Sequence, residues 1–260
     1  MIRQVTIDKL HEMRLSAMAS AFENQCADAA TYQDLSFEDR FGMLVDREWE
    51  KRKNSKLQKL IRNAEFRYPN ASVEAIEYHP DRKLDKGQML EFSTCRYITD
   101  DHHIILKGAS GNGKTFIACA LGVAACKNFI KVRYIRLPDL LNELALAHGD
   151  GTLKKVIKAY QKIDLLILDD LGAERGTEYA LEQVFAVIDA RYRSRKPLIV
   201  TTNLTLDALK HPDDLAHARI YDRLLEMCCP VCVSGENFRR ENAAQKMDRL
   251  KTLIQGKERR

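Results

Sequence analysis

Long apolar runs free of charge are missing from these 260 residues, and none approaches the roughly 20 residues that a membrane-spanning helix needs. The first residues, MIRQVTIDKLHEMRL, carry charges where a secretory signal peptide has an apolar stretch. The seven cysteines are an odd number without the spacing of a secreted disulfide framework, so at least one thiol stays outside any intramolecular disulfide. We therefore expect a cytoplasmic protein that makes no membrane contact.

A balanced charge distribution is also missing, although the net charge is only +5. Residues 47–67 hold eight Lys or Arg against three acids, and residues 239–260 again hold eight against three. The rest of the chain is therefore acidic. Two basic segments can follow the phosphate backbone of a nucleic acid, or they can be solvated helix faces, and charge alone leaves both interpretations open.

The first 68 residues read as a small all-helical domain, which we expect to bind a partner. Apolar residues recur at helical spacing between residues 6 and 25, and Ser36 with Asp39 forms a capping box that opens a longer helical pattern. Residues 69–97 carry Pro, Asn and Gly without a sustained period, which indicates a linker and a lead-in to the next domain.

Residues 98–260 alternate between strand and helix patterns and end in a basic tail. The expected strands are 103–107, 131–136, 164–170, 197–203 and 229–235, with helical patterns between them. This alternation predicts an α/β fold in which helices cover both faces of a parallel sheet.

A phosphate-binding loop follows the first of these strands. The stretch GASGNGKT fits G-x-x-x-x-G-K-[ST], in which glycine-rich backbone N–H groups surround phosphate oxygens. Gly111 and Gly113 can adopt the positive φ values that such a loop needs. Lys114 would reach the β- and γ-phosphates, and Thr115 would offer its hydroxyl to Mg²⁺. The residues expected to bind ATP are Gly108, Ala109, Ser110, Gly111, Asn112, Gly113, Lys114, Thr115 and Phe116.

Polar residues end two later strands. In the run LLILDDLG, an apolar strand ends in Asp169 and Asp170. Burying two neighbouring carboxylates costs free energy, because they repel each other and lose their hydration. A magnesium ion would offset this cost, although a solvated pair at a strand end is the alternative. Asp169 would hold Mg²⁺ through water, and Asp170 would orient or deprotonate the attacking water. Asn203, after LIVTT, could hold that water near a γ-phosphate or could simply begin a turn.

Arginines and cysteines near the end of the chain have competing interpretations. Arg219 or Arg223 could stabilise a phosphate of a neighbouring subunit, but Arg223 follows Asp222 and could instead form a structural ion pair. Arg239 could sense the nucleotide or be one more exposed cation. The C-x-x-C at residues 229–232 lies in an expected strand without a second such pair, so we interpret it as structural.

Taken together, these motifs resemble those of AAA+ ATPases of the initiator and loader branch, in the IstB-like and DnaC-like family. GASGNGKT stands at Walker A, DLLILDDLG at Walker B, TTN at sensor 1, ARIYDRL at the arginine finger and GENFR at a glycine-to-arginine motif. The helical start, with KLHEMRLSAMA and LVDREWEKRK, is similar to the IstB side.

The resemblance implies a P-loop AAA+ ATPase that uses ATP and Mg²⁺, forms homo-oligomers on duplex DNA and delivers the target to a transposase. A DnaC-like replicative helicase loader that contacts single-stranded DNA is the alternative within the family. A nucleotide-switched adaptor that binds only protein is a third hypothesis. Asp170 stands where many members have glutamate, which affects the expected hydrolysis rate more than nucleotide binding. The Asp-Arg pair of ARIYDRL favours Arg223 as the finger, with Arg219 still possible.

Overall fold

The computed structural model describes residues 2–172, 177–212 and 214–235. They divide into two compact units, with the boundary between residues 59 and 60. Among the described residues, no helix combines the length and the apolar character that crossing a membrane requires.

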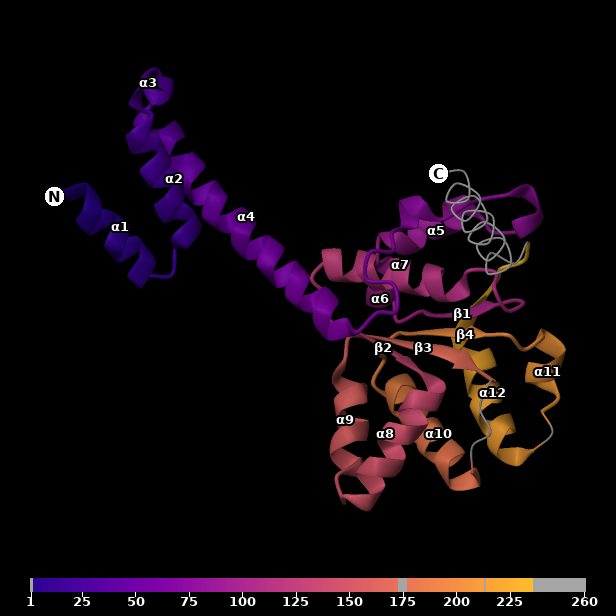
Figure 1. Ribbon diagram of the computed structural model, residues 1–260. Coiled ribbons are helices and arrows are strands. Elements are labelled where there is room, and N and C mark those ends of the chain that lie inside the picture. The colour runs from indigo at the N-terminus through magenta and orange to yellow at the C-terminus, as the bar shows by residue number, and fades with distance from the viewer. Residues whose placement is uncertain (1, 173–176, 213, 236–260) are drawn as a thin grey trace, which may run out of the picture. The chain divides into compact units, whose positions relative to one another are not determined.

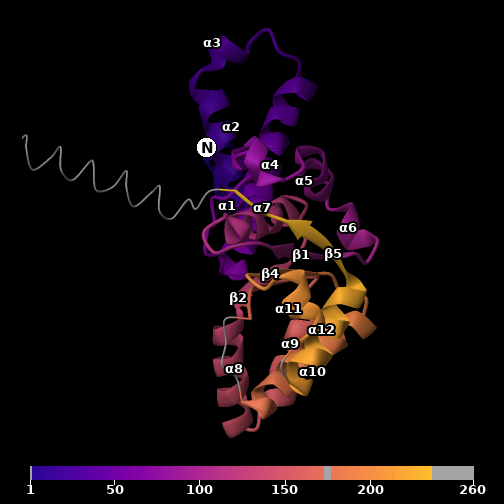
Figure 2. The same cartoon turned by 90° about the vertical axis from the view of Figure 1, so that its right-hand side faces the viewer.

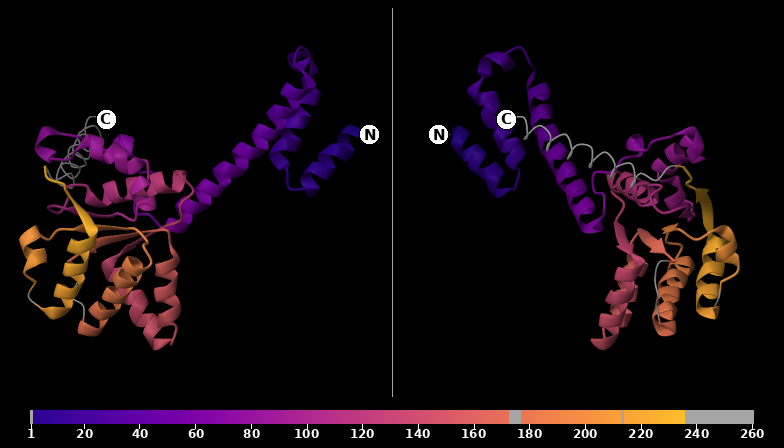
Figure 3. Two further views of the ribbon diagram at one scale, coloured as in Figure 1. Left: turned by 180° about the vertical axis from the view of Figure 1, so that it is seen from behind. Right: turned by 45° about the vertical axis from the view of Figure 1, so that its right-hand side comes forward.

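Unit 1 is all-helical, as the apolar spacing predicted. Its helices are α1 (Ile2–Glu12), α2 (Ser16–Ala27), α3 (Ala29–Tyr32) and most of α4 (Phe37–Ala64), with α2 alongside α4 (Figure 3). The periodicity between residues 6 and 25 is divided between α1 and α2, because Arg14 has a left-handed φ of 59° that interrupts the helix. Ser36 caps α4 as predicted: its hydroxyl accepts a hydrogen bond from the Asp39 amide at 3.1 Å. The Asp39 carboxylate accepts from the Ser36 hydroxyl at 2.7 Å.

A buried carboxylate joins α2 to α4. Glu48 Oε2 accepts hydrogen bonds from the amides of Ala17 at 2.9 Å and Met18 at 3.2 Å, which are orphan donors of the first turn of α2. Glu48 is 7% exposed, and Arg52 Nε donates to its other oxygen at 2.8 Å. Burial opposes ionisation of this carboxyl, but the hydrogen bonds from Arg52, Met18 and Ala17 outweigh it and lower its pKa. Glu48 therefore caps α2 from a distant part of the sequence.

Glu48→Ala should destabilise unit 1 by about 1–3 kcal/mol, because it leaves the amides of α2 without an acceptor. Trp49 is the only tryptophan of the chain, so its fluorescence during urea unfolding follows this unit. The midpoint should shift to lower urea, whereas Glu50→Ala, which changes an exposed neighbour, should leave it in place. Because the pKa of Glu48 is lowered, its contribution should be present above the ordinary pKa of glutamate and be lost as the pH falls through the lowered value. Equal midpoints for the two variants would contradict this role.

Unit 2 contains a five-stranded parallel sheet with the order β2-β3-β4-β1-β5 (Figure 1). The strands are β1 (His103–Lys107), β2 (Val132–Arg136), β3 (Leu165–Leu171), β4 (Leu198–Thr202) and β5 (Cys228–Cys232), and all five lie where the sequence predicted them. Helical elements before the sheet are η1 (Val73–Ala75), η2 (Pro80–Arg82), α5 (Lys86–Ser93) and α6 (Arg96–Thr99). Between the strands lie α7 (Lys114–Lys127), α8 (Leu137–Gly149), α9 (Leu153–Lys162), α10 (Glu178–Arg193), α11 (Leu206–Lys210) and α12 (Leu215–Met227).

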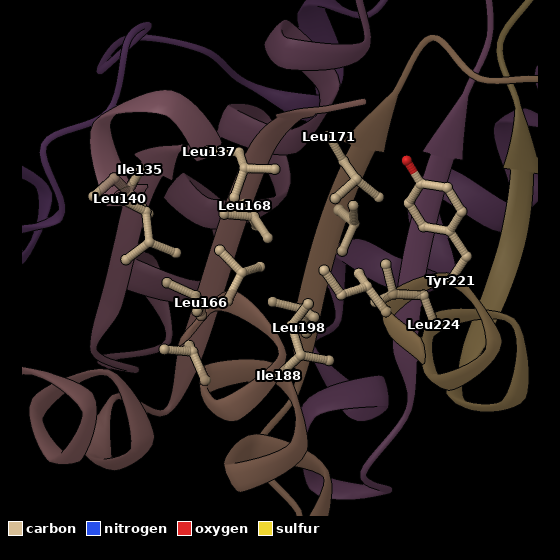
Figure 4. Close-up of a cluster of buried hydrophobic side chains, with 14 of the residues drawn as sticks. Ile135, Leu137, Leu140, Leu166, Leu168, Leu171, Ile188, Leu198, Tyr221 and Leu224 are labelled. Carbon is tan, nitrogen blue, oxygen red and sulfur yellow. The ribbon is translucent and has the colours of Figure 1, made fainter. Parts of the chain in front are cut away.

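Helices cover both faces of this sheet. Helix α7 packs on one face with α5 beside it, while α8, α10 and α12 cover the other, and β5 forms one edge (Figures 1 and 2). The core of the second face joins Leu166, Leu168 and Leu198 of the strands to the buried side chains of those helices (Figure 4). Because most side chains of β1, β3 and β4 are buried on both faces, these strands read as apolar runs, which is why the sequence located the middle of the sheet so well.

A buried arginine donates hydrogen bonds to the backbone just before β3 and β4. Arg191 of α10 is fully buried, and its guanidinium donates to the carbonyls of Tyr160 at 2.7 Å and Ile163 at 3.0 Å, and to that of Pro197. Burial lowers its pKa to about 9, which still leaves it protonated at neutral pH. The helical pattern alone gave no sign that this cation belongs to the core.

Candidate nucleotide-binding site

The glycine-rich loop lies between β1 and α7, at the carboxyl end of a central strand. Gly111 has φ 90° and Gly113 has φ 83°, as the phosphate-loop hypothesis predicted. Gly108 is needed for a different reason, because a Cβ there would lie 1.9 Å from the carbonyl oxygen of Val233. Asn112 is buried and donates from Nδ2 to that same carbonyl at 3.2 Å. The loop is therefore held against the chain that follows β5.

Lys114 bridges the loop and the neighbouring strand. Its Nζ donates to the carbonyls of Gly108 at 2.9 Å and Ala109 at 2.8 Å, and to Asn203 Oδ1 at 2.6 Å. Asn203 follows β4, which pairs with β1, so the parallel register brings it beside the loop. The structure therefore joins the two groups that the sequence placed near the γ-phosphate.

Asp169 ends a network of hydroxyl groups beneath the loop. Its carboxylate is completely buried and accepts hydrogen bonds from the hydroxyls of Thr115 at 2.9 Å, Tyr134 at 2.7 Å and Thr201 at 2.6 Å. Burial, and then the charge of Asp169, raise the pKa of Tyr134 well above its usual range, so the phenol remains a donor. The sequence had not identified Tyr134 or Thr201 as partners.

This network fits a magnesium site. No lysine or arginine in the described part of the chain forms an ion pair with Asp169, so its buried charge has no cationic partner there. Thr115, one hydrogen bond away, lines the cavity above. The described residues hold no cluster of three or more His, Cys, Asp or Glu side chains, so an ion here would take further ligands from water and phosphate.

Asp170 points in a different direction from Asp169. It has a left-handed φ of 64°, and the β3–β4 register shifts between Leu168 and Leu171. Its carboxylate lies 3.2 Å from both Nε and Nη2 of Arg136, at the end of the adjacent strand β2. Burial opposes protonation of Arg136, but the hydrogen bond and charge of Asp170 prevail and raise the pKa of the guanidinium. Asp170 lines the cavity while its carboxylate is held by this ion pair.

A cavity of about 320 Å³ opens above the loop. Most of its lining residues are ones that the sequence had indicated: Ser110, Gly111, Gly113, Lys114, Thr115, Phe116, Asp170 and Asn203. The other lining residues, Tyr68, Ala75, Glu77 and Arg82, were missed, because they come from the segment expected to be a linker or from just before it. The rings of Tyr68 and Phe116 lie 5.9 Å apart between centroids, and Arg82 Nη2 donates to the Asn112 carbonyl at 2.9 Å. A mixture of aromatic and polar groups beside a phosphate loop suits a nucleoside.

The chain is similar to known proteins over most of its length. A model of the IstB-like ATP-binding protein family matches residues 8–246. The chain belongs to this family. A relative from Pseudomonas fluorescens, described as an ATP-binding protein of insertion sequence IS1162, is 37% identical over 201 residues, which cover 77% of this chain and 87% of that protein. Another from Sinorhizobium fredii, described as an insertion sequence ATP-binding protein, is 35% identical over 244 residues, covering 92% and 98%.

Solved structures agree with the fold that the resemblance implied. The crystal structure of the DnaC helicase loader superposes with a TM-score of 0.54 and 25% identity, over 65% of this chain and 99% of that one. This IstB-like protein therefore has the parallel sheet flanked by helices of the AAA+ loader branch.

The two candidate finger arginines of this family member lie on α12, and neither lines the cavity among the described residues. Arg223 pairs with Asp189 at 3.2 Å and Glu226 at 2.8 Å, rather than with its neighbour Asp222, and lies 4.3 Å from the centroid of the Tyr192 ring. Arg219 is exposed and lies over the Phe185 ring at 4.5 Å.

Two remaining predictions concern the end of the chain. Arg239, the candidate nucleotide sensor, lies outside the described residues. The C-x-x-C spans the edge strand β5 and the thiols of Cys229 and Cys232 are free and exposed, whereas Cys228 is buried. Burial raises the pKa of the Cys228 thiol, which keeps it protonated.

Proposed function

We propose that this IstB-like protein binds and hydrolyses ATP with Mg²⁺, assembles on DNA without sequence preference and assists a transposase. The observation that carries the proposal is that Lys114, Thr115 and Asn203 line one cavity, with the buried Asp169 hydrogen-bonded to Thr115, in a chain whose relatives are insertion-sequence proteins.

In this proposal each side chain has a separate task. Lys114 and the loop amides bind the β- and γ-phosphates, and Thr115 with Asp169 holds Mg²⁺, which when bound neutralises charge on phosphate oxygens. Asp170 accepts the proton of the attacking water, and Asn203 orients that water. Arg219 or Arg223 completes the cavity of a neighbouring subunit.

The second half of α4 supplies the described part of the proposed DNA contact. Residues 51–64 contain six Lys or Arg and no acid, and all six side chains are exposed. A helix that carries only positive charges over two to four turns can contact a row of phosphates. The other basic segment, 239–260, lies outside the described residues.

Fluorescence anisotropy of labelled DNA tests this proposal directly. Duplex and single-stranded DNA are titrated with protein in the presence of ATP, ADP or no nucleotide, with Lys114→Ala as the control that removes nucleotide binding. ATP-dependent binding to duplex supports the transposition helper. Absence of binding to both DNA forms would leave the protein-only adaptor.

Salt dependence is a separate prediction for the same contact. The logarithm of affinity should fall steeply with the logarithm of salt concentration, by roughly 0.9 for each phosphate neutralised. The double variant Lys56→Glu/Lys59→Glu should weaken binding at least about tenfold and flatten this slope. The control pair Lys131→Glu/Lys210→Glu, also exposed but outside α4, should bind as the wild type does. A flat response to salt in the wild type would contradict a phosphate contact.

A helicase loader is the second candidate, and a specific observation supports it. The match covers 99% of the DnaC helicase loader structure. A Bacillus subtilis protein described as the replicative helicase loader DnaI is 27% identical to this chain over 146 residues. This alternative predicts a preference for single-stranded DNA in the anisotropy measurement, together with binding to a replicative helicase.

A further inference from the structure

A β-bulge interrupts β3 at its two acids. Leu168 and Leu171 are three positions apart in β3, but their partners in β4 are only two positions apart. Asp169 and Asp170 therefore lie opposite the single residue Thr201. Two residues opposite one define a bulge, which redirects a side chain and is frequent next to active sites. The bulge is therefore a feature of the candidate site and needs an explanation there.

The bulge moves Asp170 out of the hydrophobic core. Side chains of a regular strand alternate between two faces, so residue 170 would follow Leu166 and Leu168 into the core that α8, α10 and α12 cover. Leu171 takes that place instead and packs in the same cluster as Leu168 (Figure 4). The side chain of Asp170 is 21% exposed and lines the nucleotide cavity. The presence of this carboxylate at the cavity therefore depends on the bulge.

A single hydroxyl contacts both acids at the bulge. Thr201 is 1% exposed, and its Oγ1 accepts a hydrogen bond from the Asp170 amide at 3.0 Å while it donates to Asp169 Oδ1 at 2.6 Å. An amide N–H can only donate and an ionised carboxylate can only accept, so the direction of both bonds is fixed. The extra residue of a bulge lacks a partner in the ladder, and here the hydroxyl supplies one for its amide.

Tyr134 contacts only one of the two acids. Its hydroxyl donates to the other oxygen of Asp169, Oδ2, at 2.7 Å. In the described part of the chain it makes no hydrogen bond to Asp170, whose contacts are with Arg136 and Thr201. Loss of the Tyr134 hydroxyl should therefore disturb the carboxylate of Asp169 alone, whereas loss of the Thr201 hydroxyl should disturb both acids.

We propose that Thr201 is a positioning residue for ATP hydrolysis, which holds the bulge that brings Asp170 to the cavity and orients Asp169 beneath the phosphate loop. The inference rests on the proposed function, because that function makes Asp170 the base and Asp169 a holder of Mg²⁺. It gives Thr201 a task different from that of Asn203, which lines the cavity itself.

Hydrogen exchange tests the bulge in the full-length chain without nucleotide or DNA. Thr201→Val removes the hydroxyl and keeps the shape of the side chain, while Thr201→Ser keeps the hydroxyl. Peptides that contain Asp170 should show one amide that exchanges about tenfold or more faster in Thr201→Val, because a protecting hydrogen bond is lost. Thr201→Ser should exchange as the wild type does. Equal exchange in the two variants would overturn the proposal.

Turnover and binding distinguish positioning from a general loss of stability. At saturating ATP and Mg²⁺, kcat should fall about tenfold or more in Thr201→Val and clearly less in Tyr134→Phe. In calorimetry with Mg²⁺ or with EDTA, both variants should lose about tenfold of the ATP affinity that Mg²⁺ adds, as is typical when a partner of a metal-holding carboxylate is removed. Thr201→Ser should recover both quantities. A kcat of Thr201→Val no lower than that of Tyr134→Phe, or an unchanged effect of Mg²⁺, would refute the role.

A milder variant and a separate readout complete the test. If Thr201→Val does not fold, Thr201→Cys replaces it, because a thiol is a weak donor and a weak acceptor. Values for Thr201→Cys equal to those for Thr201→Ser would then refute the proposal. A wild type that hydrolyses no ATP would end the proposed function, whereas the exchange measurement would still decide whether Thr201 holds the bulge.

Discussion

Lys114→Ala should weaken ATP binding by about 100-fold or more, the largest effect on binding that we expect from a single side chain. The ammonium group lies in the cavity within reach of the loop carbonyls and Asn203, and it would exchange these contacts for phosphate oxygens. Two charge-assisted hydrogen bonds of about 1.5–3 kcal/mol each give a loss of this size. Isothermal titration calorimetry with ATP and Mg²⁺ measures it.

Lys127→Ala is the matched control for that measurement, because Lys127 is exposed at the other end of α7. It should bind ATP as the wild type does. Circular dichroism verifies that both variants are folded, since Lys114 also contributes hydrogen bonds within the loop. Wild-type affinity in a folded Lys114→Ala protein would mean that the loop does not hold phosphate.

Asp170→Asn should retain ATP binding and lower the turnover rate by about 100-fold or more, the contribution typical of a general base. Asparagine has the same shape and can occupy the same place at the rim of the cavity, but its amide cannot accept the proton of the attacking water. Steady-state phosphate release, with ATP binding measured in parallel, separates the two effects.

Arg136→Gln distinguishes loss of the base from loss of the ion pair. This variant breaks the same contact with Asp170, yet leaves the carboxylate in place. It should lower the turnover rate much less than Asp170→Asn does. Equal loss in both variants would show that the pair supports the structure of the site, and retained hydrolysis in Asp170→Asn would rule out the carboxylate as the base.

The sequence by itself determined the strands and most of the residues that line the nucleotide cavity. The central strands, such as residues 103–107, are local apolar runs, and the phosphate loop is a contiguous motif whose backbone demands are met by its own residues. Parallel strands end at one edge of the sheet, so residues that follow strands, including Asp169 and Asn203, could be expected to meet there.

Tertiary structure decided the features that depend on residues distant in sequence. Tyr68 and Arg82 also line the cavity, although they come from a part of the chain without a periodic pattern, and Glu48 caps a helix about 30 residues earlier in the chain. In the sequence motif Arg223 is a candidate arginine finger, but in the fold its guanidinium forms an ion pair with Asp189, which is distant in sequence. Local patterns record which backbone a segment prefers and which side it buries. They do not record which distant polar group satisfies a given charge or hydrogen bond, because that choice is made only when the chain packs.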